Sequence, residues 1–221
     1  GPNGSGKTTL ANVISGLVSP DDGVMRLGPR GLRGLGADKI ARAGIARGFQ
    51  TPALPPSLSA LELVALARAR AAGEIGFFAA VVGRDAGKRR RRFEAEALDL
   101  LGRVGLSGEA ERACGTLPPG LAWRVEVARA LALDPGLIIL DEPAAGLGER
   151  EQAELRAALR DIAGHGIALL VIEHNMPFLL PTAHRIVVLD QGRVIAKGKP
   201  AEVVRDPAVI AAYLGREKLP A

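Results

Sequence analysis

The sequence predicts an α/β protein with a mostly parallel sheet and an inserted helical region. Three observations support this prediction. A glycine-rich loop opens the sequence and leads into a helical pattern. Near the C-terminal end, short continuous apolar runs alternate with helical patterns, which is typical of parallel strands that are covered on both faces. Between these two parts lies a mostly helical stretch that is interrupted by prolines. We therefore expect one α/β core, formed by residues 1–50 and 131–221, and a helical subdomain formed by residues 51–130.

The opening residues GPNGSGKTT match the phosphate-binding pattern G-x-x-x-x-G-K-[ST], known as the P-loop. In such a loop, backbone N–H groups surround the phosphates, the lysine reaches the β- and γ-phosphates, and the threonine hydroxyl binds Mg²⁺. Glycine lets the backbone curl closely around the anion. A chance match is the alternative in a chain with 28 glycines. The candidate phosphate-binding residues are Gly1, Asn3, Gly4, Ser5, Gly6, Lys7, Thr8 and Thr9, and Thr8 is also a candidate metal ligand.

The loop is followed by apolar residues at helical spacing. Leu10, Val13, Ile14 and Leu17 stand at i, i+3, i+4 and i+7, so we expect a helix that starts near Lys7. Its N-terminus would point at the same phosphates. A P-loop is ordinarily held by a preceding strand, and we expect that strand to lie ahead of Gly1.

The rest of the first part has weaker signals. Residues 28–36 are rich in glycine and proline and are expected to form a loop or short strands. Residues 45–49 are expected to form a strand. Gln50 follows that run, and at a strand end its amide could reach a metal ion or a water molecule. An ordinary loop residue is the alternative.

In the helical part, we expect helices over residues 58–72, 89–104 and about 122–133, with a turn at residues 118–120. The basic run Lys88–Arg92 could contact nucleic acid or lipid headgroups. It opens a helix with apolar and acidic residues in alternation, so we interpret it as a solvated helix start.

In the last part, the apolar runs 137–140, 168–172 and 186–189 are expected to be buried parallel strands. A helix over about residues 149–163 would point Leu155, Leu159 and Ile162 inward. A tight turn at residues 190–192 would lead into a β-hairpin.

Two acids end the first of these strands. Asp141 stands where a P-loop ATPase holds Mg²⁺, the Walker B arrangement, and Glu142 is placed to polarise the water that attacks the γ-phosphate. His174 follows the strand 168–172 and could donate a hydrogen bond to the γ-phosphate. His165 and His184 have no comparable setting and are expected at the surface or at helix ends.

Composition sets broad limits. The chain of 221 residues is 48% hydrophobic and can bury a substantial core. Its single cysteine, Cys114, excludes a disulfide within the chain. No apolar run reaches the roughly 18–20 residues of a membrane span. The net charge of +5 permits an anionic partner but does not require one.

The order of these motifs resembles the ATP-binding subunits of ABC transporters. The P-loop, Gln50, a turn at residues 117–121, Asp141-Glu142-Pro143 and His174 follow one another as in that family. The segments IARAGIARGFQ, VEVARALALDP, AAGL, IEHNM and DPAVIAAYLG are similar to those of branched-chain amino acid uptake ATPases. The long insert of residues 67–93 resembles that of the longer of the two ATPase subunits in such systems.

The resemblance implies a RecA-like P-loop NTPase fold and Mg²⁺-dependent ATP hydrolysis. It also implies a head-to-tail dimer with a second ATP-binding subunit. Lys7, Thr8 and Thr9 would bind phosphate and metal, Asp141 would bind Mg²⁺, and Gln50 would couple the site to transport. Glu142 would be the general base, His174 a γ-phosphate contact, and Gly120 would serve the partner's ATP. The further partners would be membrane permease subunits and, indirectly, a periplasmic binding protein, with no nucleic acid. The subunit would sit peripherally at the cytoplasmic face of the plasma membrane.

One motif departs from the family pattern. Where Leu-Ser-Gly-Gly-Gln is usual, the sequence has Leu117-Pro118-Pro119-Gly120-Leu121. Pro118 lacks the hydroxyl and the N–H that would meet the γ-phosphate. Proline is tolerated at a helix start, so the helix N-terminus can still point at the partner's ATP.

Two other function classes remain open. One is a soluble ABC-type ATPase that acts on nucleic acid or ribosomes, for which the basic run would matter. The other is a module that binds nucleotide without hydrolysis, which Glu142 argues against. Genes adjacent to the full-length gene would separate transport from the first class.

Overall fold

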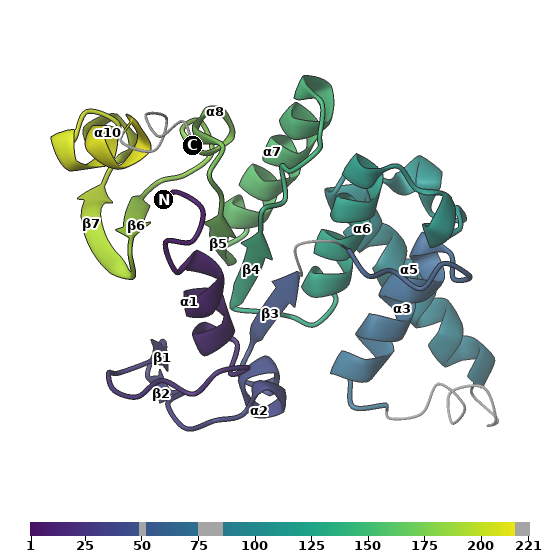
Figure 1. Cartoon of the computed structure of the whole chain (residues 1–221). Helices are drawn as coiled ribbons and strands as arrows, with labels where there is room; N and C mark the ends of the chain where they lie inside the picture. The colour runs from purple at the N-terminus through teal and green to yellow at the C-terminus, as the bar shows by residue number, and fades with distance from the viewer. Residues whose placement is uncertain (49–51, 75–85, 215–221) are drawn as a thin grey trace.

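The computed structural model describes residues 1–48, 52–74 and 86–214. A central sheet lies between α1 (Lys7–Ile14) on one side and a group of helices on the other (Figure 1). Gln50 lies outside the described residues. Besides the elements introduced below, the chain forms the short strands β1 (Arg26–Leu27) and β2 (Arg30–Gly31), the helices α2 (Ala37–Arg42), α8 (Met176–Leu179), α9 (Pro200–Val203) and α10 (Pro207–Leu214), and the 3-10 turns η1 (Ser107–Glu109) and η2 (Cys114–Thr116).

The central sheet is parallel, as expected. It has the order β3 (Ile45–Gly48), β4 (Leu137–Asp141) and β5 (Ala168–Ile172). The middle strand β4 is covered on both faces: Ile138 and Leu140 pack in the large core, and Ile139 packs in a smaller core with Ala11 of α1. The side chains of Ile138, Ile139 and Leu140 are all 0% exposed, which confirms the buried strand that the continuous apolar run predicted.

The prediction of a third parallel strand over residues 186–189 is wrong. β6 (Ile186–Asp190) pairs antiparallel with β7 (Arg193–Gly198) in a separate two-stranded sheet. The hairpin prediction is confirmed, but Val187 is 48% exposed, so β6 is not covered on both faces. A cavity of about 880 Å³ lies along β5 and β6, with Gly1 among its lining residues. This cavity explains why Leu169, Leu170 and Val171 of β5 are only partly buried.

The helix after the glycine-rich loop is confirmed and starts at Lys7. Of the side chains that produced the helical pattern, Ile14 is partly buried against the smaller core, but the fully buried residue of the helix is a different one. Leu10 and Leu17 are 43% and 54% exposed, while Ala11 is fully buried against the sheet. A small side chain at this position lets the helix backbone approach β4 closely.

The helical region comprises α3 (Ala60–Ala71), α5 (Ala86–Arg103) and α6 (Pro119–Leu131) (Figure 1). All three expected helices are present. α3 begins with a capping box in which Ser59 accepts from Glu62 N and the Glu62 carboxylate accepts from Ser59 N. α6 starts three residues before the expected Ala122, because Pro119 occupies the first helical position, where its missing N–H is not needed.

The same large core runs through the helical region and the sheet. It joins Ala60 and Leu101 of the helices to Ile138 of β4 and to Leu155 of α7 (Glu149–Gly164). Leu155, Leu159 and Ile162 of α7 are buried, as the helical spacing predicted. The division of the chain at residues 50 and 131 stays a prediction.

The basic run at the start of α5 lies at the protein surface. Arg89 and Arg92 pair with Glu74, and Arg90 pairs with Glu94 one turn along the helix. Arg92 also lies over the ring of Phe93, 4.4 Å from its centre. These ion pairs agree with the interpretation of a solvated helix start. Among the described residues, no helix is both long and apolar enough to cross a membrane.

Candidate functional site

The glycine-rich loop forms a curled backbone directly ahead of α1. Gly4 and Gly6 have φ of 77° and 98°, in the left-handed region that favours glycine. The Lys7 ammonium lies over the loop and donates to the carbonyl oxygens of Gly1 and Pro2, both at 2.8 Å. Asn3, Gly4, Thr8 and Thr9 are exposed, so the groups expected to bind phosphate are accessible. Ser5 is fully buried and its hydroxyl has no hydrogen-bond partner among the described residues.

Asp141 is the last residue of β4 and is almost completely buried. Burial raises the pKa of its carboxyl group, while the Arg47 and Lys7 charges act in the opposite direction and Glu142 acts with burial. The guanidinium of Arg47, on β3, lies 3.4 Å from Asp141 Oδ2. Arg47 also donates to Asn12 Oδ1 of α1, so it links the helix that follows the glycine-rich loop to the end of β4.

The two carboxylate oxygens of Asp141 differ in their hydrogen bonding. Oδ1 is buried and has no hydrogen-bond partner among the described residues. A buried acceptor of this kind ordinarily has a partner, and Mg²⁺ prefers carboxylate and hydroxyl oxygen ligands. The unpartnered carboxylate oxygen of Asp141 therefore fits a Mg²⁺ ion, and the exposed hydroxyl of Thr8 stays the second candidate ligand. Within the described part of the chain, no cluster of three or more His, Cys, Asp or Glu side chains could hold a metal by itself.

Glu142 and His174 are brought together from two strands. Glu142 follows β4 directly, with a φ of 53° that is uncommon outside glycine, and its N–H donates to Ile172 O of β5 at 2.8 Å. His174 Nδ1 lies 3.4 Å from Glu142 Oε1. The imidazole is about half exposed and the carboxylate is 18% exposed. Both side chains are therefore accessible to a ligand.

The sequence reasoning missed two residues of this region. Glu173 is 3% exposed, and its carboxylate accepts hydrogen bonds from Ala144 N at 2.8 Å and from His174 N at 3.2 Å. Burial raises its pKa, and these backbone bonds oppose the shift. Glu173 thus ties the turn after Glu142 to the loop that carries His174. Arg47 is the other missed residue. The available signal was a charged residue inside or directly after an apolar strand.

Gly120 is not part of this site within the chain. It lies in the first turn of α6, buried, and a Cβ atom placed on it would lie 2.6 Å from Glu151 Oε1 of α7. α6 lies on the other side of the sheet from α1 and the loop (Figure 1). Its role toward a second subunit's nucleotide stays a prediction.

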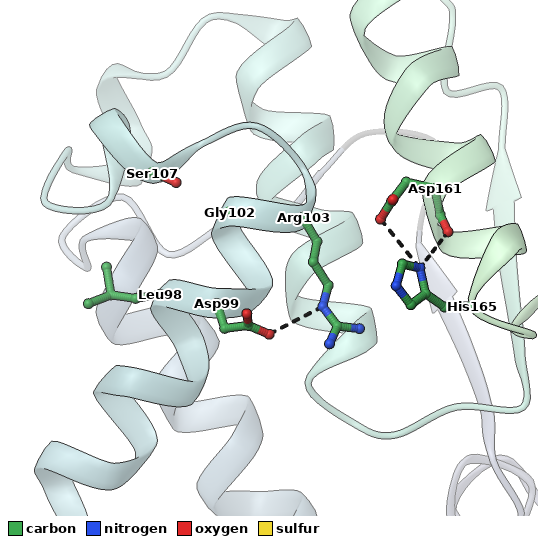
Figure 2. A pocket seen from close by; sticks show the side chains of 7 residues that line it. All are labelled: Leu98, Asp99, Gly102, Arg103, Ser107, Asp161 and His165. Atoms are coloured by element: carbon green, nitrogen blue, oxygen red, sulfur yellow. Dashed lines mark hydrogen bonds and ion pairs between the residues drawn. The ribbon is translucent and has the colours of Figure 1, made fainter.

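A second cavity, of about 550 Å³, contains none of the candidate residues. It lies between α5 and α7, where Asp99 pairs with Arg103 and Asp161 pairs with His165 (Figure 2). All four side chains are at least 40% exposed. His165 caps the end of α7 and His184 is exposed, which confirms their interpretation as surface or helix-end residues.

Comparisons with known proteins identify the family. Residues 1–145 match the model of the "ABC transporter" family, and residues 193–218 match that of the "Branched-chain amino acid ATP-binding cassette transporter". The chain is 38% identical to the high-affinity branched-chain amino acid transport ATP-binding protein BraF of Pseudomonas aeruginosa, over 97% of the chain and 85% of the relative. It is 36% identical to LivG of Escherichia coli, which carries the same description, at the same coverage.

Solved structures agree with this assignment. An ATP-binding cassette of an ABC transporter, MJ1267, matches in its ADP conformation with a TM-score of 0.79 and 27% identity, over 97% of this chain and 85% of that one. A dimeric cassette, MJ0796, bound to ADP and Pi, matches with a TM-score of 0.69 and 27% identity, over 90% and 82% of the two chains. With its glycine-rich loop, its paired acids at the end of β4 and these relatives, the chain belongs to the ATP-binding proteins of the ABC transporter family.

Proposed function

We propose that this chain binds and hydrolyses ATP to drive the uptake of branched-chain amino acids through membrane permease subunits. The single observation that carries the catalytic part is the Glu142–His174 pair, with 3.4 Å between Glu142 Oε1 and His174 Nδ1, directly after Asp141 at the end of β4. The relatives' names and the match of residues 193–218 support the transported substrate. They favour transport over the alternative of a nucleic-acid or ribosome ATPase.

In this proposal the loop residues hold the phosphates and Glu142 acts on water. The backbone of residues 1–6 and the Lys7 ammonium bind the β- and γ-phosphates, and Thr9 adds a hydroxyl. Glu142 accepts a proton from the water whose oxygen bonds to the γ-phosphorus, as the bond to the ADP oxygen breaks. His174 donates a hydrogen bond to the γ-phosphate and keeps Glu142 in place.

Mg²⁺ would be bound by Thr8 and Asp141, with Gln50 as a further ligand. When bound, it neutralises phosphate charge. Asp141 would contribute Oδ1 to the metal, while Arg47 holds the side chain in place through Oδ2. Gln50 would also transmit the state of the site to the permease.

The assembly is a dimer with a second ATP-binding subunit, in which Gly120 and the N-terminus of α6 face the partner's ATP. The dimer sits peripherally at the cytoplasmic face of the plasma membrane, on permease subunits. A periplasmic substrate-binding protein delivers the amino acid to these permeases. Closure of the two subunits on ATP would move the helical region and the permease that is docked on it.

The test compares wild type with Glu142→Gln in the assembled transporter. Glu142→Gln removes the base and leaves the phosphate contacts intact, so we expect ATP binding to persist while phosphate release falls about 10²–10⁴-fold. Uptake of radiolabelled leucine into vesicles should fall in parallel. Phosphate release within about threefold of wild type would remove Glu142 from the base role. Normal ATPase activity without amino acid uptake would refute only the proposed substrate.

A further inference from the structure

Arg47 is a buried cation that joins three elements around Asp141. It lies on β3 with only 9% of its side chain exposed. Its Nη1 donates to Asn12 Oδ1 at 2.7 Å and to Ser15 Oγ at 2.8 Å, both at the helix that follows the P-loop. Its Nη2 faces Asp141 Oδ2 at 3.4 Å. A long charged side chain is rarely buried unless its charge is compensated, and Asp141 supplies the compensating charge.

The pairing divides the two oxygens of Asp141 between two cations. Arg47 faces Oδ2, while Oδ1 has no hydrogen-bond partner among the described residues. Under the proposed function, Oδ1 is the oxygen that remains for Mg²⁺. The guanidinium therefore compensates the carboxylate charge before the metal arrives, and afterwards it is a like charge on the opposite side of the same carboxylate.

We propose that Arg47 is an internal counter-ion of Asp141 that weakens Mg²⁺ binding and so sets how strongly ATP binding depends on the metal. This inference rests on the proposed function of the P-loop site. Two effects of opposite sign follow from removing Arg47. The loss of its hydrogen bonds lets the Asp141 side chain rotate, which weakens metal binding. The loss of its charge removes repulsion between a divalent and a monovalent cation in a region of low dielectric, which strengthens metal binding. The charge effect is the larger one, because a buried Coulomb interaction outweighs the ordering of one short side chain.

The measurement is the dissociation constant of ATP by calorimetry, once with Mg²⁺ and once with EDTA. The ratio of the EDTA value to the Mg²⁺ value reports how much the metal strengthens ATP binding. In Arg47→Met this ratio should rise about fivefold or more over wild type, because a neutral side chain no longer repels Mg²⁺. Arg47→Lys keeps the charge, and its ratio should stay within about twofold of wild type. Arg47→Gln, neutral but polar, should follow Arg47→Met.

Arg124→Met is the matched control. Arg124 is also largely buried, at 11% exposure, and pairs with Glu154 at 3.0 Å, but it lies on α6 in the helical region. Its loss should lower the thermal midpoint and leave the ratio unchanged. In Arg47→Met the thermal midpoint should fall without ligand and recover with Mg²⁺ and ATP, since Mg²⁺ then supplies the missing positive charge.

Several results would overturn the inference. One is an unchanged or lower ratio in folded Arg47→Met and Arg47→Gln. Another is an Arg47→Lys variant in which the ratio of the two ATP dissociation constants rises as much as in the neutral variants. A failure of both neutral variants to fold, even with Mg²⁺ and ATP, would assign Arg47 to the fold alone. Failure of the proposed function looks different, because wild type itself would then bind no ATP.

Discussion

The helical region and the sheet edge differ in how their buried polar groups are paired. By the sheet edge we mean the carboxyl ends of β4 and β5 together with the glycine-rich loop. In the helical region, Val64 and Leu101 are fully buried in the core, and the buried carboxylate of Glu126 is paired with Arg129. At the sheet edge, Ser5 Oγ and Asp141 Oδ1 are buried without a partner in the described residues, and Glu142 has a positive φ. The two unpartnered acceptors, Ser5 Oγ and Asp141 Oδ1, lie where a ligand is expected, so the first region supplies stability and the second supplies chemistry.

The largest expected effect on stability tests the helical region. Leu101→Ala removes a fully buried side chain of α5 and should lower the free energy of unfolding by about 2–5 kcal/mol. ATP affinity at a temperature where the variant is folded should stay within about twofold of wild type, because the change leaves the sheet edge intact. Denaturant unfolding and calorimetry measure the two quantities. A loss of ATP affinity beyond this would show that the two regions are not separable.

A smaller effect is expected for Glu173→Gln at the sheet edge. One carboxylate oxygen faces Ala144 N and the other faces His174 N, and a glutamine amide would place N–H groups against one of these donors. The mismatch should cost about 1–3 kcal/mol, seen as roughly tenfold slower phosphate release with little change in ATP affinity. Glu109→Gln, in the exposed turn η1, is the control and should leave turnover unchanged. Full activity of Glu173→Gln would mean that the tie between the two loops is dispensable.

Pro118→Ser should have a still smaller effect, and only in the assembled dimer. A serine hydroxyl at this helix start would donate to the partner's γ-phosphate, where a charge-assisted hydrogen bond contributes about 1.5–3 kcal/mol in a dry site. Loss of the proline costs about 0.4–1 kcal/mol of stability. We expect a gain of at least about threefold in ATP turnover or affinity with the natural partners, and none in the isolated subunit. An unchanged or lower rate would indicate that Gly120 and the helix N-terminus suffice.

The smallest effect is expected from the basic run. Replacing Arg89, Arg90 and Arg92 by glutamine breaks exposed ion pairs with Glu74 and Glu94, which contribute little to stability because water screens them. ATPase activity should stay within about twofold of wild type, with no change in binding to duplex DNA. If wild type bound DNA tightly at about 200 mM salt and the variant did not, the result would support the nucleic-acid alternative.

Much of the architecture followed from local pattern. Apolar spacing located α3, α5 and α7, and the continuous apolar run located β4. The P-loop, Asp141 and Glu142 could be found because their chemistry depends on residues that are adjacent in sequence. The start of α6 was misplaced by three residues because Pro119 was interpreted as part of a turn, although proline also suits a first helical position.

The sequence by itself therefore determined the fold class, the P-loop and the acids that end β4, since each depends on short-range periodicity or on neighbouring residues. Only the tertiary structure decided which groups face one another across the fold. Arg47 contacts Asp141, which lies 94 residues further along the sequence, and Glu173 contacts Ala144, which lies 29 residues before it. It also decided that α1 buries Ala11 in place of Leu10, and that β6 pairs with β7 outside the parallel sheet. Such contacts depend on how elements pack, and packing is set by all the surfaces that compete for the same space.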